Sequence, residues 1–326
     1  MDEFMHNDRG RPGVGLQKWK KTVFFGPMRM LTEIALIIGL VIAVVVIARL
    51  SRLIIKEIRA FRVTRIYDDR HWDFDHILSQ YNPYYKSLDD TVRDRFLRRV
   101  LHFMEDKDFE FIDIEKEERM PLLISAAAVQ LTFGLEHYLL DYFKTIYVLK
   151  ENYRYGLYNM PFEGHVSEEG IYLSWANFIR EFTDYSDGQN VGLHEMAHAL
   201  AYVNFTVQEG RDDTFHDKFK DFSAVARPVF ERMQAGETTV LDPYASTNYH
   251  EFWAVSIETF FERTHAFKKQ LPELYEALCT LLNQDPLTSL KIIDPGFLDE
   301  AGEMPGLAFA PEILPKPVRT DRDGNL

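Results

Sequence analysis

The sequence predicts an α+β fold that is mostly helical, with a small sheet beside one motif-bearing helix and one N-terminal transmembrane helix. Three observations support this prediction. They are an uncharged apolar run near the N-terminus, apolar residues at helical spacing in the body, and two short segments rich in β-branched and aromatic residues. The chain has 326 residues, 46% of them hydrophobic and 27% charged, which excludes a low-complexity or wholly disordered protein.

Charge is distributed unevenly along the chain. The net charge is −14, yet residues 1–70 hold 13 Lys and Arg against 7 Asp and Glu, and the remainder holds 24 against 44. An acidic body argues against a nucleic-acid partner, whereas a basic region beside an apolar run points to a membrane. The single cysteine, Cys279, excludes an intramolecular disulfide, and its apolar surroundings argue against a nucleophilic role.

The first element is the apolar run Ile34–Ala48 (IALIIGLVIAVVVIA), which Leu31 and Leu53–Ile55 extend on its two sides. Eighteen helical residues cover about 27 Å, close to the roughly 30 Å of a bilayer core. A signal peptide fits poorly because no small-residue cleavage site follows, and a buried soluble helix would show a polar stripe. We therefore expect a single-pass transmembrane helix over residues 31–55, through which the protein contacts the membrane.

Basic residues flank this run on both sides, and more of them follow it than precede it. Because lysine and arginine accumulate on the cytoplasmic side of membranes, this count favours a cytoplasmic body. The residues that follow are Arg49, Arg52, Lys56, Arg59, Arg62 and Arg65, and those that precede are Lys18, Lys20, Lys21 and Arg29.

The body begins with helical patterns. Apolar residues recur at helical spacing over 88–104, and the uncharged run 120–135 is expected to be a buried core helix because it is short and carries polar residues. The cluster His71–His76 (HWDFDH) is expected to be a loop with solvated polar groups. The segments 145–149 (TIYVL) and 170–175 (GIYLSW) are expected to be strands, the second an edge strand suited to binding an extended peptide.

The next element carries the chemistry. Residues 187–200 (DGQNVGLHEMAHAL) contain the pattern H-E-x-x-H at His194–His198, and Asn190 can cap a helix there. Residues four apart share one helix face, so both imidazoles can point at one zinc ion, while Glu195 can reach a water bound to it. The structural alternative is a helix with two partly buried histidines and a solvated glutamate.

A site with two histidines needs a third ligand, and no histidine follows at the metzincin spacing. The next candidate lies in 241–261 (LDPYASTNYHEFWAVSIETFF), where Asn248 can cap a helix and Glu251 falls in its first turn. A capping box with Asn248 is the alternative role for Glu251, and a solvated face is the alternative for Glu258 and Glu262. The helix is crowded with apolar residues, however, and a buried carboxylate needs a partner or a metal.

These segments resemble the Mlc titration factor A (MtfA) family of zinc peptidases, whose catalytic core is similar to that of anthrax lethal factor. The resemblance covers roughly residues 85–275 and implies a zincin-like metallopeptidase core. It implies that His194 and His198 bind Zn²⁺ and that Glu195 is the general base. The stretch Glu251-Phe252-Trp253-Ala254 matches the family's E-F-F-A, which makes Glu251 the third ligand.

The resemblance also implies a role for Tyr244, seven residues before Glu251, as a hydrogen-bond donor in catalysis. The sequence departs from the family at Ala201, where an aspartate is usual and serves to orient the metal ligands. Glu258 could supply such a contact behind a zinc-bound histidine, with a surface carboxylate as the alternative. His250 is expected to point away from the ion because adjacent helical residues diverge by about 100°.

The expected function is a membrane-anchored zinc-dependent peptidase that acts on peptides or proteins. Two alternatives are a membrane-tethered regulatory module that sequesters a protein partner around a structural zinc, and a zinc hydrolase acting on other bonds. The expected organisation, in chain order, is a polar tail (1–30), the transmembrane helix (31–55), a juxtamembrane linker (56–84), a zinc peptidase domain (85–302) and an irregular tail (303–326).

Overall fold

A computed structural model describes residues 25–156, 160–185, 187–207, 209–288 and 316–317. The backbone divides into two compact units, residues 1–57 and 58–326. The described part is mostly helical with one small mixed sheet, which confirms the predicted fold class. Most of the tail expected over 303–326 lies outside the described residues, as does most of the tail expected over 1–30.

The first unit contains the start of helix α1 (Phe25–Tyr81), which includes the predicted apolar run. Its apolar side chains are exposed, with Leu36 at 74% and Ile47 at 65% of their full accessible surface. Within the described ranges, this is the one helix long and apolar enough to cross a membrane.

Helix α1 ends in the second unit, at Tyr81, and this part differs from two expectations. The cluster His71–His76 is helical, so the prediction of a loop there is wrong. The stretch expected as a linker over 56–84 is helical as well, and it places Phe74 and Leu78 in the core. These two residues are four apart and share one helix face, a short apolar pattern that the surrounding charges conceal.

The sheet contains five strands in the order β1-β2-β4-β3-β5. Strands β1, β2 and β4 are parallel, β3 is antiparallel to β4, and β5 is antiparallel to β3. Their bounds are β1 (Asp108–Ile112), β2 (Thr145–Leu149), β3 (Phe162–Ser167), β4 (Gly170–Ser174) and β5 (Lys316–Pro317).

Strands β2 and β4 confirm the two predicted strands, but one inference about them is wrong. We expected the GIYLSW segment to form an edge strand, whereas β4 lies between β2 and β3. The two outer strands of this sheet are β1 and β5. The sequence of β3, FEGHVS, carries a glycine and charged or polar residues, which weakens its strand pattern.

The helices of the second unit confirm the two predicted at 88–104 and 120–135, as α3 and α4. After α1 the helices are α2 (Pro83–Lys86), α3 (Asp90–Asp106), α4 (Arg119–Thr132), α5 (Trp175–Thr183), α6 (Val191–Tyr202), α7 (Asp213–Gln234), α8 (Tyr249–Glu262), α9 (Thr264–Gln270) and α10 (Pro272–Leu282). A π-helical turn, η1 (Val203–Val207), follows α6, and a 3₁₀ turn, η2 (Pro243–Ser246), precedes α8.

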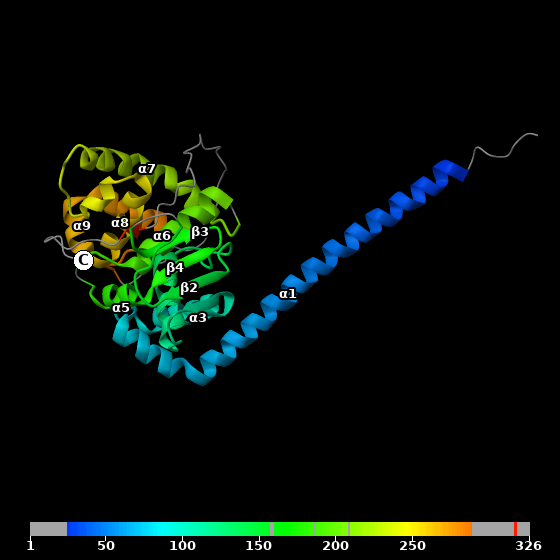
Figure 1. The fold of residues 1–326 in the computed structure, drawn as a ribbon, viewed down its shortest axis with the longest axis horizontal. Helices are drawn as coiled ribbons and strands as arrows, with labels where there is room; N and C mark the ends of the chain where they lie inside the picture. Colours follow the sequence, from blue (N-terminus) through cyan, green and yellow to red (C-terminus); the bar gives the residue numbers. More distant parts are fainter. Residues whose placement is uncertain (1–24, 157–159, 186, 208, 289–315, 318–326) are drawn as a thin grey trace, which may run out of the picture. The chain divides into compact units, whose positions relative to one another are not determined.

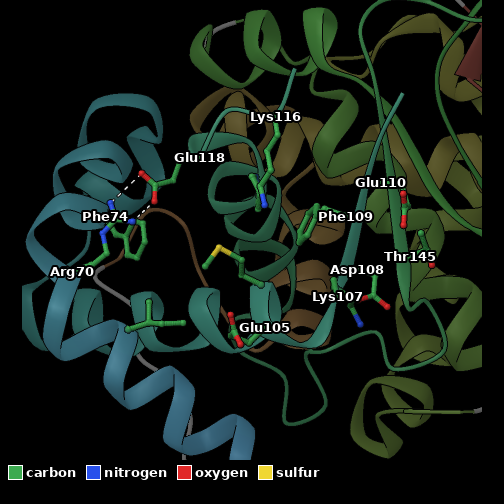
Figure 2. A pocket seen from close by; sticks show the side chains of 13 residues that line it. Arg70, Phe74, Glu105, Lys107, Asp108, Phe109, Glu110, Lys116, Glu118 and Thr145 are labelled. Atoms are coloured by element: carbon green, nitrogen blue, oxygen red, sulfur yellow. Dashed lines mark hydrogen bonds and ion pairs between the residues drawn. The ribbon is translucent and has the colours of Figure 1, made fainter. Parts of the chain in front are cut away.

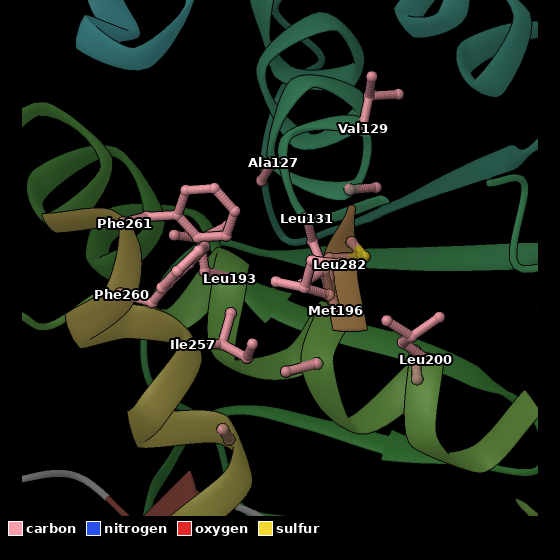
Figure 3. Packing of buried hydrophobic residues seen from close by; sticks show 14 of the residues in the cluster. Ala127, Val129, Leu131, Leu193, Met196, Leu200, Ile257, Phe260, Phe261 and Leu282 are labelled. Carbon is pink, nitrogen blue, oxygen red and sulfur yellow. The ribbon is translucent and has the colours of Figure 1, made fainter. Parts of the chain in front are cut away.

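Helix α6 is the centre of the second unit. It packs against β3 and β4 on one side and against α4 and α8 on others (Figure 1). Apolar side chains fill the space between these helices, among them Leu131 from α4, Met196 from α6 and Ile257 from α8 (Figure 3). The indole Nε1 of Trp253 donates to the carbonyl of Ala197 at 2.8 Å, which ties α8 to α6.

A surface cavity of about 710 Å³ lies away from this centre (Figure 2). Arg70 and Phe74 of α1 form one wall, and Lys107 and Asp108 at the junction of α3 and β1 form another. The charged groups there are already paired in part, since the Arg70 guanidinium bonds to Glu118.

Candidate metal centre

The N-terminus of α6 is fixed by the predicted cap. The side chain of Asn190 accepts a hydrogen bond from the Leu193 amide at 2.9 Å. All residues of α6 are buried, including His194, Glu195 and His198. The alternative of partly buried histidines with a solvated glutamate therefore does not describe this helix.

The N-terminus of α8 is fixed in the same manner. Asn248 accepts hydrogen bonds from the amides of His250 and Glu251 at 2.9 and 3.0 Å. The Glu251 side chain points at the histidines of α6, because its Oε2 lies 3.0 Å from His194 Nε2 and 3.7 Å from His198 Nε2. Its orientation is therefore that of a potential ligand, while Asn248 alone provides the cap.

Three donor atoms converge at this point. Ligand atoms of His194, His198 and Glu251 all lie within 4.8 Å of one another, and the three residues are buried. The Nε2 atoms of the two histidines are 3.1 Å apart. His250, the neighbour of Glu251, is not part of this group of donors.

The protonation pattern of His194 shows why a cation fits here. Its Nδ1 lies 2.5 Å from Glu258 Oε1, and a carboxylate accepts, so Nδ1 carries the proton. The Nε2 of a neutral imidazole then offers a lone pair toward Glu251 Oε2 and His198 Nε2. A proton or a metal ion placed between these three atoms would satisfy their lone pairs in this buried site. Two nitrogens and one carboxylate oxygen are a donor set that suits a metal such as zinc.

The electrostatics of Glu251 agree with this arrangement. Burial alone would raise the pKa of its carboxyl, but the neighbouring His198 and His194 lower the pKa well below its ordinary value. The carboxyl is therefore held in its charged form, the form that binds metal.

The side chain of Glu195 lies against Gly164 of strand β3. A Cβ atom added to Gly164 would lie 2.6 Å from Glu195 Cγ, so only glycine allows β3 to pass this close to the side chain. Sequence analysis missed Gly164 because it did not identify β3 as a strand. The signal available was a lone glycine inside a short segment with aromatic and β-branched residues.

Tyr244 belongs to the turn η2 just before α8. The Asp242 carboxylate accepts from the Tyr244 amide at 2.8 Å, and this fixes the turn. The Tyr244 ring is half-buried, and its centroid lies 6.3 Å from that of the His194 imidazole. The phenol therefore lies at the edge of the donor cluster.

Buried carboxyl groups support the start of α6 from behind. Glu258 is 0% exposed, and its Oε2 accepts from the Asn190 amide at 2.7 Å. Glu262 is 8% exposed, and its Oε1 accepts from the Asn190 side-chain amide at 2.8 Å. The alternative of a solvated face for these two residues is thereby excluded. Ala201 is also buried, and Glu258 is the acid that contacts His194.

Comparison with known proteins supports the family resemblance seen in the sequence motifs. A model of the family described as glucose-regulated metallo-peptidase M90 matches residues 58–282. An uncharacterized protein of Synechocystis sp. is 26% identical over 239 residues, which cover 67% of this chain and 85% of the relative.

Proteins named Mlc titration factor A are similar over a shorter region. The protein of Escherichia fergusonii is 32% identical over 129 residues, 37% of this chain and 47% of the relative. The protein of Cronobacter sakazakii is 27% identical over 140 residues, 41% of this chain and 52% of the relative. The chain thus spans about half the length of these relatives, and the matches confirm the resemblance inferred from the motifs.

The buried Glu262 predicts a pH dependence of stability. Burial, with a contribution from the charge of Glu258, raises its pKa from 4.5 to about 10. The folded protein keeps this proton while the unfolded chain releases it, so raising the pH within that window favours unfolding, by at most about 1.4 kcal/mol per pH unit. Glu262→Gln removes this effect. The melting temperature of the Glu262→Gln protein minus that of the wild type should therefore be larger at pH 9 than at pH 5, as measured by circular dichroism.

Glu273→Gln, on the exposed side of α10, is the matched control and should follow the wild type at both pH values. A Glu262→Gln protein that loses stability equally at pH 5 and pH 9 would contradict the protonated state of Glu262.

Proposed function

The chain belongs to the glucose-regulated metallo-peptidase M90 family, and on this basis we propose that it is a membrane-anchored zinc peptidase that hydrolyses peptide bonds. The observation that carries the proposal is the convergence of His194, His198 and Glu251, with Glu195 on the same helix as both histidines. A coordination site of this kind, with three protein ligands and one open position, is the arrangement of catalytic zinc.

The metal would be held by Nε2 of each histidine and by the Glu251 carboxylate. When bound, zinc supplies Lewis-acid polarisation and makes water a stronger nucleophile near neutral pH. Glu195 would accept the proton of the attacking water and deliver it to the leaving amine. Burial of Glu195 against Gly164 restricts its rotamers and keeps bulk water from its carboxyl group.

Two further residues would act around this centre. Tyr244 would donate a hydrogen bond to the oxyanion that develops on the substrate carbonyl. Glu258 would orient His194 through Nδ1 and raise the basicity of its ligating nitrogen. Glu258 thus fills the orienting role that the usual aspartate at position 201 has in the family.

The apolar part of α1 would anchor the protein in the membrane. Arginines and lysines follow this part in larger number than they precede it, which favours a cytoplasmic body. The peptidase domain would then act on peptides or proteins near the inner face of the membrane. It would begin before residue 85, because Phe74 and Leu78 of α1 already belong to the core.

A second function is favoured by the relatives named Mlc titration factor A, whose name describes titration of Mlc. By analogy, this protein would tether and sequester a regulatory protein at the membrane, with zinc in a structural role. A protein with Glu195→Gln separates the two functions. Its cellular effects would persist if the protein acts by binding and would disappear if it acts by hydrolysis.

The first prediction from this proposed function concerns the general base. Glu195→Gln should retain one zinc per chain and lose hydrolysis of a peptide library by about 10²–10⁴-fold, because the amide cannot accept the water proton. Metal content is measured by mass spectrometry of the purified protein, and cleavage by peptide sequencing. His198→Ala is the matched control and should lose both zinc and activity. Full activity in the Glu195→Gln protein would refute the assignment of the base.

The second prediction concerns Tyr244. Tyr244→Phe should leave the zinc content unchanged and reduce kcat by about 10²–10³-fold, the usual effect of losing one oxyanion donor. Tyr249→Phe is the control, since the Tyr249 hydroxyl contacts Ser223 instead. The role of Tyr244 would be excluded if both variants showed the same kcat.

The third prediction concerns Glu258. Glu258→Gln should weaken zinc binding by about 10–100-fold in a competition titration with a fluorescent chelator, because the contact to His194 loses its charge. Glu262→Gln, in the same buried network but without contact to a histidine, should keep the wild-type affinity. Equal affinities in all three proteins would show that Glu258 only supports the helix.

A further inference from the structure

A buried histidine lies next to the residue that contacts the proposed general base. His165 follows Gly164 in β3, and the side chain of Glu195 lies against that glycine. His165 is 2% exposed, and the hydroxyl of Tyr153 lies 2.6 Å from its Nδ1 atom. Neither His165 nor Tyr153 belongs to the group of metal donors, and the proposed function gives neither of them a role.

Backbone pairing fixes Tyr153 next to the same strand. Its amide donates to the carbonyl of Phe162 at 3.1 Å, and its carbonyl accepts from the Phe162 amide at 2.7 Å. Phe162 lies two residues before Gly164, so the phenol is held near the part of β3 that contacts Glu195. Burial and, after it, the charge of Glu195 raise the pKa of Tyr153 well above its ordinary value. The phenol is therefore neutral and lies within electrostatic reach of the Glu195 carboxylate.

Aromatic packing holds the imidazole of His165 in one orientation. The ring of Tyr172, its partner on β4, stacks on it with centroids 4.2 Å apart and an interplanar angle of 14°. The ring of Tyr155 lies against it as well, with a centroid distance of 4.0 Å. A buried ring packed against two others has few alternative rotamers, so Nδ1 stays directed at the Tyr153 hydroxyl.

The proton on this imidazole decides what the phenol can do. Burial lowers the pKa of His165 to about 4, so the ring is neutral at physiological pH and carries one proton. Its Nε2 atom is buried and has no hydrogen-bond partner among the described residues. Buried N–H groups without an acceptor are rarer in proteins than buried acceptors without a donor, which favours the tautomer with the proton on Nδ1.

This tautomer leaves the phenol with a proton to donate. His165 Nδ1–H then donates to the oxygen of Tyr153, and the phenolic O–H points away from the imidazole. Within the described part of the chain, the bond to His165 is the one hydrogen bond of the Tyr153 hydroxyl. Tyr153 is also partly exposed, so a molecule bound beside Glu195 can supply the acceptor. In a peptide, the acceptor present at every residue is the backbone carbonyl.

We propose that Tyr153 is a further substrate-binding residue, whose hydroxyl donates a hydrogen bond to a backbone carbonyl of a peptide bound beside Glu195. His165 is the residue that positions this hydroxyl. The inference deepens the proposed peptidase function and rests on it. A donor that contacts the substrate equally before and during the reaction contributes to binding, so its loss raises KM and leaves kcat unchanged.

The position of the histidine proton tests the arrangement without relying on catalysis. NMR spectroscopy of the full-length protein in detergent, with ¹⁵N-labelled histidine, distinguishes a protonated ring nitrogen from a bare one. The signals of His165 are those absent from the His165→Leu protein. We expect a protonated Nδ1 and a bare Nε2 at neutral pH. A proton on Nε2 would overturn the proposal, because Tyr153 would then donate to the imidazole and have no proton for a substrate.

Kinetics test the contact with the substrate. With a fluorogenic peptide that the wild type cleaves, Tyr153→Phe should raise KM about three- to tenfold at the same kcat, the effect of losing one neutral hydrogen bond. His165→Leu should raise KM by the same factor and have no further effect in the Tyr153→Phe protein. Tyr172→Phe is the matched control, since it keeps the ring that stacks on His165, and it should show the wild-type KM.

Two outcomes separate this inference from the proposed function. If the wild type cleaves peptides and Tyr153→Phe does so with an unchanged KM, the role of Tyr153 is refuted and the peptidase function remains. If the wild type cleaves no peptide of the library, the proposed function is refuted, and the inferred contact with a substrate falls with it. The histidine spectrum then still shows whether the Tyr153 hydroxyl is free to donate.

Discussion

The convergence of three buried donor atoms is the constraint on which the site depends. Two come from one face of α6, at His194 and His198, and the third comes from Glu251 at the start of α8. The packing of α8 on α6, which includes the hydrogen bond from the Trp253 indole to the Ala197 carbonyl, brings the three atoms together. A cation bound between them would add its binding free energy to the stability of the fold.

The start of α6 shows how the second unit supports this geometry. Asn190 caps the helix with its side chain, and its backbone amide and side-chain amide bond to Glu258 and Glu262. Glu181 of α5 accepts from the amide of Val191 at 2.7 Å. Carboxyl groups at a helix N-terminus satisfy amides that lack helical partners and complement the helix dipole. Because Glu258 also contacts His194, the helix cap and the orientation of a metal ligand are coupled.

Local signals explain which parts could be predicted from the sequence. The spacing of His194 and His198 places both on one helix face, and the caps at Asn190 and Asn248 follow from residues within one turn. The position of Glu251 beside the histidines depends on the packing of α8 on α6. Its assignment as the third ligand came from the motif resemblance. Gly164 and the register of β5 could not be predicted, because strand pairing joins residues far apart in sequence. The helical course of residues 71–76 was missed because its apolar positions are few.

Zinc K-edge X-ray absorption on the purified, zinc-loaded protein tests the central claim most directly, because it counts and identifies the atoms bound to the ion. The account predicts two imidazole nitrogens at about 2.0–2.1 Å, a carboxylate oxygen at about 2.0–2.2 Å and a further light-atom ligand. A spectrum of the wild-type protein with a sulfur ligand, or with oxygen ligands and no imidazole, would contradict the account.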